Sequence, residues 1–202
     1  MSAVTISAKD VGELRKRTGA GMMDCKKALE ENGGDMAKAA EWLRARGILK
    51  AEKREGREAR EGRIEVYQHH NGKIAVLVEV SCETDFVART PDFIALCRDL
   101  AMHVASAAPL AVRIEDLNAE VVERERRIYT EQVVQEGKPE AVRGRIVEGK
   151  LKKFYAESVL LEQPFVKDDK QTVGELVKSA SGKIGENIQV RRVVRFQLGE
   201  AV

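Results

Sequence analysis

The side chains that most often carry catalysis, redox chemistry or metal binding are few in this sequence, and they are not grouped. Adjacent histidines in a turn rarely chelate a metal alone, and the cysteines form no CxxC pair and no zinc-ligand spacing. No nucleophile elbow, HExxH motif or phosphate-binding loop is present. We therefore expect no enzymatic activity, and neither a metal nor a cofactor belonging to the chain itself. The residues concerned are His69, His70, His103, Cys25, Cys82 and Cys97.

The stretch Thr84-Asp85-Phe86-Val87 offers a different kind of chemistry, the recognition of a partner. It places an acid beside a large aromatic side chain in a chain whose aromatic fraction is only 4%. In one interpretation Thr84 and Asp85 begin a helix and Phe86 enters the core. In the other, the stretch is a separate short turn, because the next helix has its own start at Thr90-Pro91, and Phe86 is an exposed interface anchor. The residues alone leave both interpretations open.

Length and composition limit the classes to which the protein can belong. The chain has 202 residues, a formal net charge of +2 and a charged fraction of 34%. These values are typical of one or two globular domains, and so small a net charge argues against a general nucleic-acid binder. The cysteine usage fits a reducing compartment, and there is no signal-peptide pattern and no apolar run of about 18 residues. We expect a cytoplasmic protein without a membrane span.

Residues 1–49 are predicted to form a module of three helices. The glycines in residues 18–21 permit a sharp turn between the first helix and the second, and Asn32-Gly33-Gly34 stops the second. Asp35 is a suitable N-cap for a third helix, which Gly47 is expected to end. A module of this size has a thin core and is only marginally stable alone.

Residues 50–62 interleave charges of both signs and contain almost no apolar side chains. This composition predicts a charged linker, or a helix that is loosely held. An RNA-contacting basic helix is the functional alternative for this stretch, but its acidic residues weigh against that interpretation.

Residues 63–118 and 159–202 are predicted to form one α+β core, with a small antiparallel sheet packed by helices on one face. Asn71-Gly72 is a strong signal for a hairpin turn. A helix begins at Thr90 and ends before the proline at 109; His103, near its end, is expected to be a surface or capping residue. The predicted strands share alternating or β-branched patterns, and they are residues 64–67, 73–80 and 187–196.

Residues 119–158 are predicted to be a helical hairpin inserted into this core. Gly137-Lys138-Pro139 marks the reversal between its two arms. Each arm has a narrow apolar stripe and charged outer faces, as in a two-helix coiled coil.

Two long stretches of the chain resemble signatures of a known family. Residues 14–29, LRKRTGAGMMDCKKAL, and residues 79–89, EVSCETDFVAR, are similar to the two signatures of the bacterial elongation factor Ts family. The resemblance covers nearly the whole chain in order, because shorter stretches are also similar to the family. These are residues 100–105, 148–154, 163–166 and 184–188.

The resemblance implies a guanine-nucleotide exchange factor for elongation factor Tu. Such a factor acts on the magnesium and GDP held by its partner, and it binds no nucleotide itself. The resemblance further implies that residues 84–87 insert near the magnesium and phosphate site of Tu, with Asp85 and Phe86 as the inserting pair and Thr84 and Val87 in support.

Further contacts with Tu are implied by the same resemblance. The three-helix module is similar to ubiquitin-associated domains, and its Arg15, Met22 and Met23 match positions that dock on the same domain of Tu. A histidine of the family's core that touches Tu is matched by His69 or by His70, and the choice between the two stays open.

The chain departs from longer family members, which carry two related copies of the core, because it has room for only one. The short form implies that two chains pair through the core sheet to give a 2:2 complex with Tu. The final strand, residues 188–196, is a candidate for that pairing, since an unpaired strand edge invites it.

A ribosome- or RNA-associated binding protein is the competing function. It would use Arg191, Arg192 and Arg195 together with residues 50–63, and it would bind RNA with a steep dependence on salt.

Overall fold

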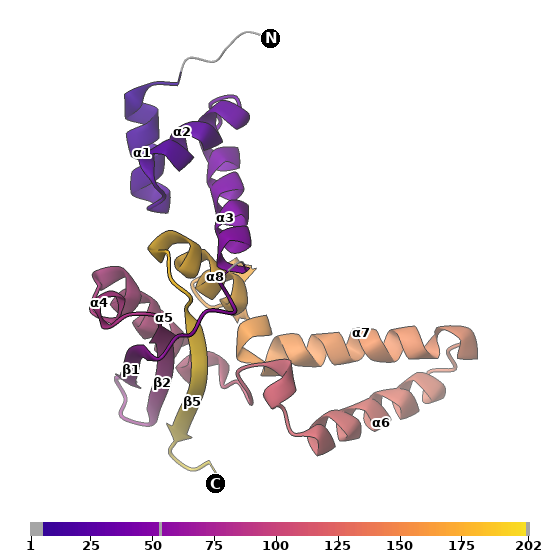
Figure 1. The fold of residues 1–202 in the computed structure, drawn as a ribbon. Coiled ribbons are helices and arrows are strands. Elements are labelled where there is room, and N and C mark those ends of the chain that lie inside the picture. Colours follow the sequence, from indigo (N-terminus) through magenta and orange to yellow (C-terminus); the bar gives the residue numbers. More distant parts are fainter. Residues whose placement is uncertain (1–5, 53, 201–202) are drawn as a thin grey trace.

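The computed structural model describes residues 6–52 and 54–200. Figure 1 shows three parts: a small helical module at the N-terminal end, a core of strands and helices, and two long helices that project from the core. The described chain is therefore an α+β protein, as the sequence predicts.

The N-terminal module consists of three helices: α1, Ala8–Thr18; α2, Met22–Glu31; and α3, Met36–Glu52. The turn between α1 and α2 has Gly19 at φ 66°, a left-handed conformation that glycine adopts without strain. Apolar side chains from all three helices meet in one small cluster. Its buried members are Val11, Leu14, Cys25, Ala28, Leu29, Ala39 and Leu43.

The prediction that Gly47 ends the third helix is wrong, because α3 continues to Glu52. Gly47 instead lies against Gly182 of helix α8 (Val173–Ile184), in the core. A Cβ atom on Gly182 would lie only 2.4 Å from the carbonyl oxygen of Gly47. Because neither glycine has a side chain, the backbones of α3 and α8 can approach closely. Gly47 is thus a packing residue within α3 and not the end of the helix.

The sheet of the core has three antiparallel strands in the order β1-β2-β5. These strands are β1, Glu61–Gln68; β2, Ile74–Cys82; and β5, Gln189–Gln197. β2 lies in the centre, and its Leu77 is opposite both Val66 and Val194. The predicted hairpin turn is confirmed, with Gly72 donating its N–H to the carbonyl of His69 at 2.8 Å.

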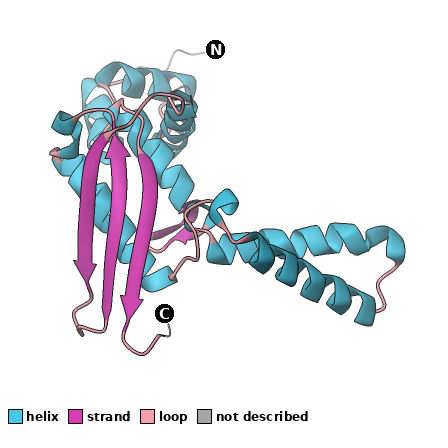
Figure 2. Ribbon diagram, turned by 60° about the horizontal axis from the view of Figure 1, so that its bottom comes forward, coloured by secondary structure: helices cyan, strands magenta, loops and turns pink. Residues whose placement is uncertain are grey.

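Helix α5, Pro91–Ala107, packs on one face of this sheet and forms the main core with it. Thr90 caps α5 with Pro91 at its first position, as predicted. Figure 2 shows the three strands in front, with the helices behind them. The core includes Val76, Val78 and Val80 of β2 and Phe93 and Leu100 of α5.

The predicted helical hairpin is confirmed as α6, Ala119–Gln135, and α7, Glu140–Ser158. The two helices pack together through Val133, Val147 and Leu151, which are buried. Two short 3-10 helices, η1 (Ile114–Asp116) and η2 (Leu160–Glu162), flank the hairpin.

A second, two-stranded sheet lies beyond η2. It pairs β3, Pro164–Phe165, with β4, Asp168–Thr172. Within the described part of the chain, no helix has both the length and the hydropathy that crossing a membrane requires.

His103 is not the surface or capping residue that the sequence predicts, because its side chain is fully buried. Its Nε2 lies 2.9 Å from Oε1 of Gln163, and its Nδ1 accepts the N–H of Val166 at 3.3 Å. Burial lowers the pKa of His103 below the ordinary value of 6.5, and the bond to Gln163 opposes this shift. Gln163, 60 positions away in the sequence, thus provides a hydrogen-bond partner for this buried histidine.

The contact between α3 and α8 yields a stability prediction. Gly182→Ala should destabilise the protein by about 1–3 kcal/mol, because the new methyl group meets backbone that cannot rotate away. Gly149→Ala in α7 is the matched control, since nothing lies within 4 Å of its Cβ position, and it should be neutral or stabilising by up to about 1 kcal/mol. Urea unfolding measures both; equal stability changes would contradict the close packing.

The buried histidine yields a pH prediction. Because the folded pKa of His103 lies below the unfolded value, its neutral form favours folding above pH 6.5, and this contribution falls as pH decreases through 6.5. His103→Gln removes the titrating group. The stability difference between wild type and this variant should therefore shrink from pH 7.5 to pH 5.5 in urea unfolding, and a constant difference would contradict the neutral, buried state.

Candidate partner-binding corner

The residues 84–87, here called the 84–87 corner, lie between the central strand and helix α5. Helix α4, Asp85–Ala88, is a single turn, and Thr84 caps it by accepting the N–H of Val87 at 3.3 Å. Val87 is buried, whereas the side chain of Phe86 is 76% exposed. The structure thus decides between the two interpretations of the sequence: α4 is separate from α5, and Phe86 points away from the core.

Asp85 is also exposed, and its Oδ2 accepts a hydrogen bond from the guanidinium of Arg89 at 2.9 Å. Both side chains of this pair are mostly in solvent, where such pairs contribute little to stability. Asp85 can therefore exchange Arg89 for a group on another protein at small cost. An acid and an aromatic side chain are presented together at the surface.

The 84–87 corner is held from its two flanks. On one side, the hydroxyl of Thr90 donates to the carbonyl of Val87 at 2.8 Å and also caps α5. On the other side, the thiol of Cys82 donates to the carbonyl of Thr84 at 3.1 Å. Burial, followed by the nearby charge of Glu186, raises the pKa of Cys82 to about 11, so the thiol keeps its proton near neutral pH.

Glu186, which follows α8, makes two contacts with Thr84 of the corner and one with Glu83, the residue before it. Its Oε2 accepts the backbone N–H groups of Glu83 at 2.9 Å and Thr84 at 3.1 Å, and its Oε1 accepts the Thr84 hydroxyl at 2.7 Å. The residue types and spacings of the sequence indicate no role for Glu186. Its only signal was the family-like stretch 184–188, because no local spacing connects residues about 100 positions apart.

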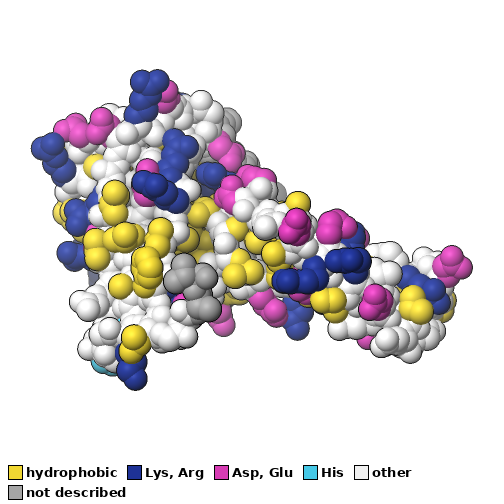
Figure 3. Space-filling view, turned by 90° about the horizontal axis from the view of Figure 1, so that it is seen from below, with side chains coloured by type: hydrophobic (Ala, Val, Ile, Leu, Met, Phe, Trp, Pro, Cys, Tyr) yellow, Lys and Arg dark blue, Asp and Glu magenta, His cyan; other side chains and the backbone are white. Residues whose placement is uncertain are grey.

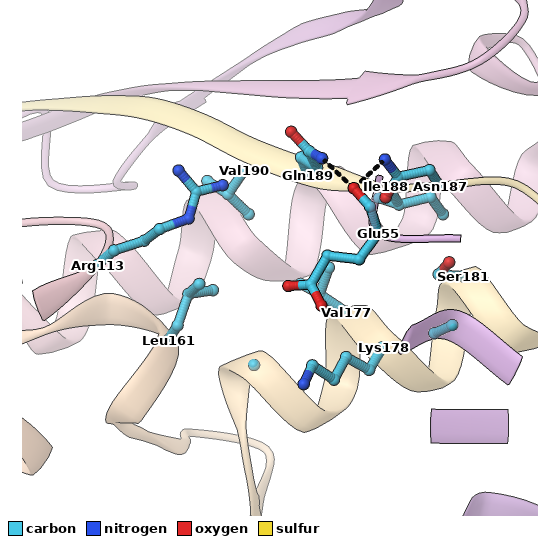
Figure 4. Close-up of a pocket in the computed structure, with 12 residues that line it drawn as sticks. Glu55, Arg113, Leu161, Val177, Lys178, Ser181, Asn187, Ile188, Gln189 and Val190 are labelled. Atoms are coloured by element: carbon cyan, nitrogen blue, oxygen red, sulfur yellow. Dashed lines mark hydrogen bonds between the residues drawn. The ribbon is translucent and has the colours of Figure 1, made fainter. Parts of the chain in front are cut away.

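The residues 54–60, here called the connecting segment, join the N-terminal module to the sheet and are tied down through their backbone. Figure 4 shows the side-chain amides of Asn187 and Gln189 converging on the carbonyl of Glu55, at 3.2 and 3.4 Å. Asn187 also donates to the carbonyl of Arg57 at 2.6 Å. Glu55, Asn187 and Gln189 also line a cavity of about 100 Å³, together with apolar side chains such as Val177.

The N-terminal residues that the resemblance implicates are exposed. Met22 is 51% and Met23 74% exposed, and Arg15 is exposed in the preceding helix. The turn between these helices packs on Lys183 of α8, because a Cβ atom on Gly19 would lie 2.1 Å from its Cε.

Lys183 also pairs with a residue beside the 84–87 corner. Its Nζ lies 3.0 Å from a carboxylate oxygen of Asp92, in the first turn of α5. One lysine thus touches both the module and the start of α5. Both candidate contact regions therefore adjoin the same end of α8.

His69 and His70 are placed elsewhere. They lie in the turn that precedes β2, whereas the 84–87 corner follows β2, so this nine-residue strand separates them by about 30 Å. His69 is half-buried with Nδ1 3.0 Å from the Tyr67 hydroxyl, and His70 is exposed. The structure does not bring these histidines together with the other predicted site residues.

The arginines of the RNA-binding alternative contact groups of the chain itself. Arg191 donates to the hydroxyl of Ser81 at 3.2 Å, and Arg192 donates to the carboxylate of Glu79 at 2.5 Å. Arg195 donates to the carboxylate of Glu200 at 2.7 Å. These contacts weigh against a basic patch that is open to RNA. Among residues 6–52 and 54–200, no cluster of three or more His, Cys, Asp or Glu side chains is placed to hold a metal ion.

Comparison with known proteins gives consistent results over the whole chain. A sequence profile of the family described as "Elongation factor TS" matches residues 4–200. The chain is 53% identical over 197 residues to "Elongation factor Ts" of Desulforamulus reducens. The aligned region covers 98% of this chain and 91% of that protein. It is 55% identical over 195 residues to "Elongation factor Ts" of Fervidobacterium nodosum. Here the aligned region covers 96% of this chain and 99% of that protein. The chain therefore belongs to the elongation factor Ts family.

Proposed function

We propose that the chain is a guanine-nucleotide exchange factor for elongation factor Tu. It binds Tu with GDP, promotes the release of GDP, and so allows GTP to enter. The observation that carries this proposal is the exposed Phe86 on a separately capped helical turn, next to the exposed Asp85. Membership of the elongation factor Ts family supports it.

The proposed activity needs binding energy and no covalent chemistry. An exchange factor must bind nucleotide-free Tu more tightly than it binds Tu with GDP, because only a difference between two states can shift their equilibrium. By linkage, the factor by which the chain weakens GDP binding equals the factor by which GDP weakens binding of the chain. The chain itself requires neither a metal nor a cofactor for this.

Within this mechanism the 84–87 corner inserts near the magnesium and phosphate site of Tu. The ring of Phe86 becomes buried between elements of Tu and supplies the desolvated anchor. Asp85 leaves Arg89 and supplies a charge that competes for groups around the magnesium ion. Val87, which is buried in the chain's own core, keeps the turn in place while its neighbours engage Tu.

The N-terminal module supplies a second contact with Tu through Arg15, Met22 and Met23. Methionine side chains suit such a surface because they are flexible and adapt to the facing shape. Their contact with Tu adds affinity without belonging to the nucleotide-displacing step. His69 and His70, at the far end of β2, would meet a different part of the assembly.

We further propose that two chains pair through the core sheet, giving a 2:2 complex with Tu. The side of the sheet away from α5 carries apolar side chains that are unusually exposed, and Figure 3 shows hydrophobic side chains gathered on this part of the surface. A face of this kind marks an interaction site, and a twofold axis lets it cover itself. Its exposed apolar members are Ile64, Val66, Leu77, Val194 and Phe196.

This apolar face favours packing of sheet on sheet over pairing at the edge of β5. Edge pairing would leave these side chains in water, whereas packing two sheets face to face removes them from it. Leu77 is at the centre, because Val66 and Val194 lie opposite it on the two neighbouring strands.

The exchange function predicts a large effect of Phe86→Ala. Loss of a buried aromatic anchor costs about 2 kcal/mol or more, so release of a fluorescent GDP from Tu should slow about 30-fold or more in stopped flow. The melting temperature should not change, because the ring is 76% exposed. Leu110→Ala, at a residue 66% exposed outside the corner, is the matched control and should keep the wild-type rate. An unchanged rate for Phe86→Ala would refute the role of the corner.

The pairing proposal predicts that Leu77→Lys yields monomers. Twofold symmetry places two such lysines near each other in an apolar interface, where their charges repel and lose hydration. Sedimentation velocity should give the mass of a dimer for wild type and half that mass for the variant. Val142→Lys in the hairpin, also 41% exposed in wild type, should remain dimeric. Wild type that sediments as a monomer at micromolar concentration would exclude the dimer.

A further inference from the structure

We propose that Glu186 is a positioning residue for nucleotide exchange: it fixes the 84–87 corner in the shape that presents Asp85 and Phe86. This inference rests on the proposed function and extends it to a residue that would not itself touch Tu. The three contacts of its carboxylate reach the capping hydroxyl of Thr84 and the backbone N–H groups of Glu83 and Thr84, and they leave Phe86 free for a partner.

The Thr84 hydroxyl makes the contact on which the shape of α4 depends. Its proton is donated to Glu186, so its lone pairs are directed to the N–H of Val87, where the cap of α4 requires them. Without Glu186, this hydroxyl could rotate and donate elsewhere, and the N–H groups of Glu83 and Thr84 would lose their acceptor. One carboxylate thus determines both the entry of the chain into the corner and the orientation of its cap.

Glu186 is itself held firmly enough to act in this way. Helix α8 ends at Ile184 and is capped by Gly185, which has φ 93°, and the hydroxyl of Ser181 in α8 donates to the carbonyl of Glu186. The contact with the corner is reciprocal, because the backbone N–H of Asn187 donates to Oε1 of Glu83 at 2.6 Å. Each of the two acidic residues thus contacts the backbone of the opposite segment, which resists sliding of one segment past the other.

The same joint connects the corner with the N-terminal module. The guanidinium of Arg57, in the connecting segment, lies 3.6 Å from Oε1 of Glu83, and Asn187 holds the carbonyls of Glu55 and Arg57. The side chains of these two neighbours therefore hold different segments. The carboxylate of Glu186 holds the corner, and the amide of Asn187 holds the connecting segment. This separation makes it possible to distinguish a specific role of Glu186 from a general loss of structure.

The test uses the full chain with Tu and fluorescent GDP, and it measures release against the concentration of the chain. Glu186→Ala should lower the maximal release rate about tenfold, while the half-saturating concentration changes less than threefold, because the corner becomes disordered but remains present. Glu186→Gln keeps one acceptor oxygen and should restore part of the rate. Asp116→Ala, which removes a carboxylate that accepts the N–H of Arg113 at 3.0 Å beside the hairpin, should have no effect.

A second measurement does not depend on Tu. Hydrogen exchange of the backbone amides of Glu83 and Thr84 should accelerate in Glu186→Ala, since these amides lose their acceptor. It should accelerate less in Glu186→Gln, which keeps one acceptor oxygen, and it should not change in Asp116→Ala. If Glu186→Ala does not fold, Glu186→Gln carries the comparison, because it keeps the size of the side chain.

A double variant tests whether Glu186 acts through Phe86. Glu186→Ala combined with Phe86→Ala should release GDP at the rate of Phe86→Ala alone within about twofold. Once the Phe86 ring is absent, disorder of the corner removes no further contact with Tu. If Phe86→Ala slows release but the Glu186 variants leave release and amide protection unchanged, the positioning role is overturned and the proposed function stands. If Phe86→Ala itself has no effect on GDP release, the proposed role of the corner in nucleotide exchange is refuted.

Discussion

A helix of four residues cannot hold itself together in water, because the first hydrogen-bonded turn fixes several residues and gains little. Yet α4 must stay folded while Phe86 stands 76% exposed at the surface instead of folding back into the core. The contacts that satisfy both demands come from outside α4. Thr90 caps it at one end, and Thr84, itself held by Glu186, caps it at the other.

Helix α8 and the residues after it connect the parts of the molecule that are proposed to meet Tu. Gly182 lets α3 approach closely, Lys183 contacts both the turn at Gly19 and the start of α5, and Glu186 holds the 84–87 corner. The N-terminal module and the corner are thus attached to a common element. In the proposed mechanism, this attachment lets docking of the module and insertion of Phe86 occur without rearrangement of either part.

Much of the fold could be predicted from the sequence because its signals are local. The cap at Thr90-Pro91, the Asn71-Gly72 turn and the narrow apolar stripes of the hairpin each specify a structure within a few residues. The exposure of Phe86 could be anticipated only as one of two alternatives. Choosing between them required knowing that Val87 and Ala88 are the residues of α4 that enter the core.

The features that the sequence could not predict all depend on contacts between distant segments. Gly47 looks like a helix terminator until Gly182 is seen against it. His103 looks like a surface residue until Gln163 and Val166 are found as its partners. Glu186 has no pattern of its own, because its acceptor role involves backbone groups about 100 residues earlier.

The central claim is that the 84–87 corner converts binding energy into nucleotide release. Its most direct test is the affinity of the chain for nucleotide-free Tu and for Tu with GDP, measured by calorimetry with wild type and with Phe86→Ala. We expect wild type to bind nucleotide-free Tu much more tightly, and the variant to lose most of that difference while it keeps the contact through the N-terminal module. An affinity ratio that is the same for wild type and variant would contradict the claim.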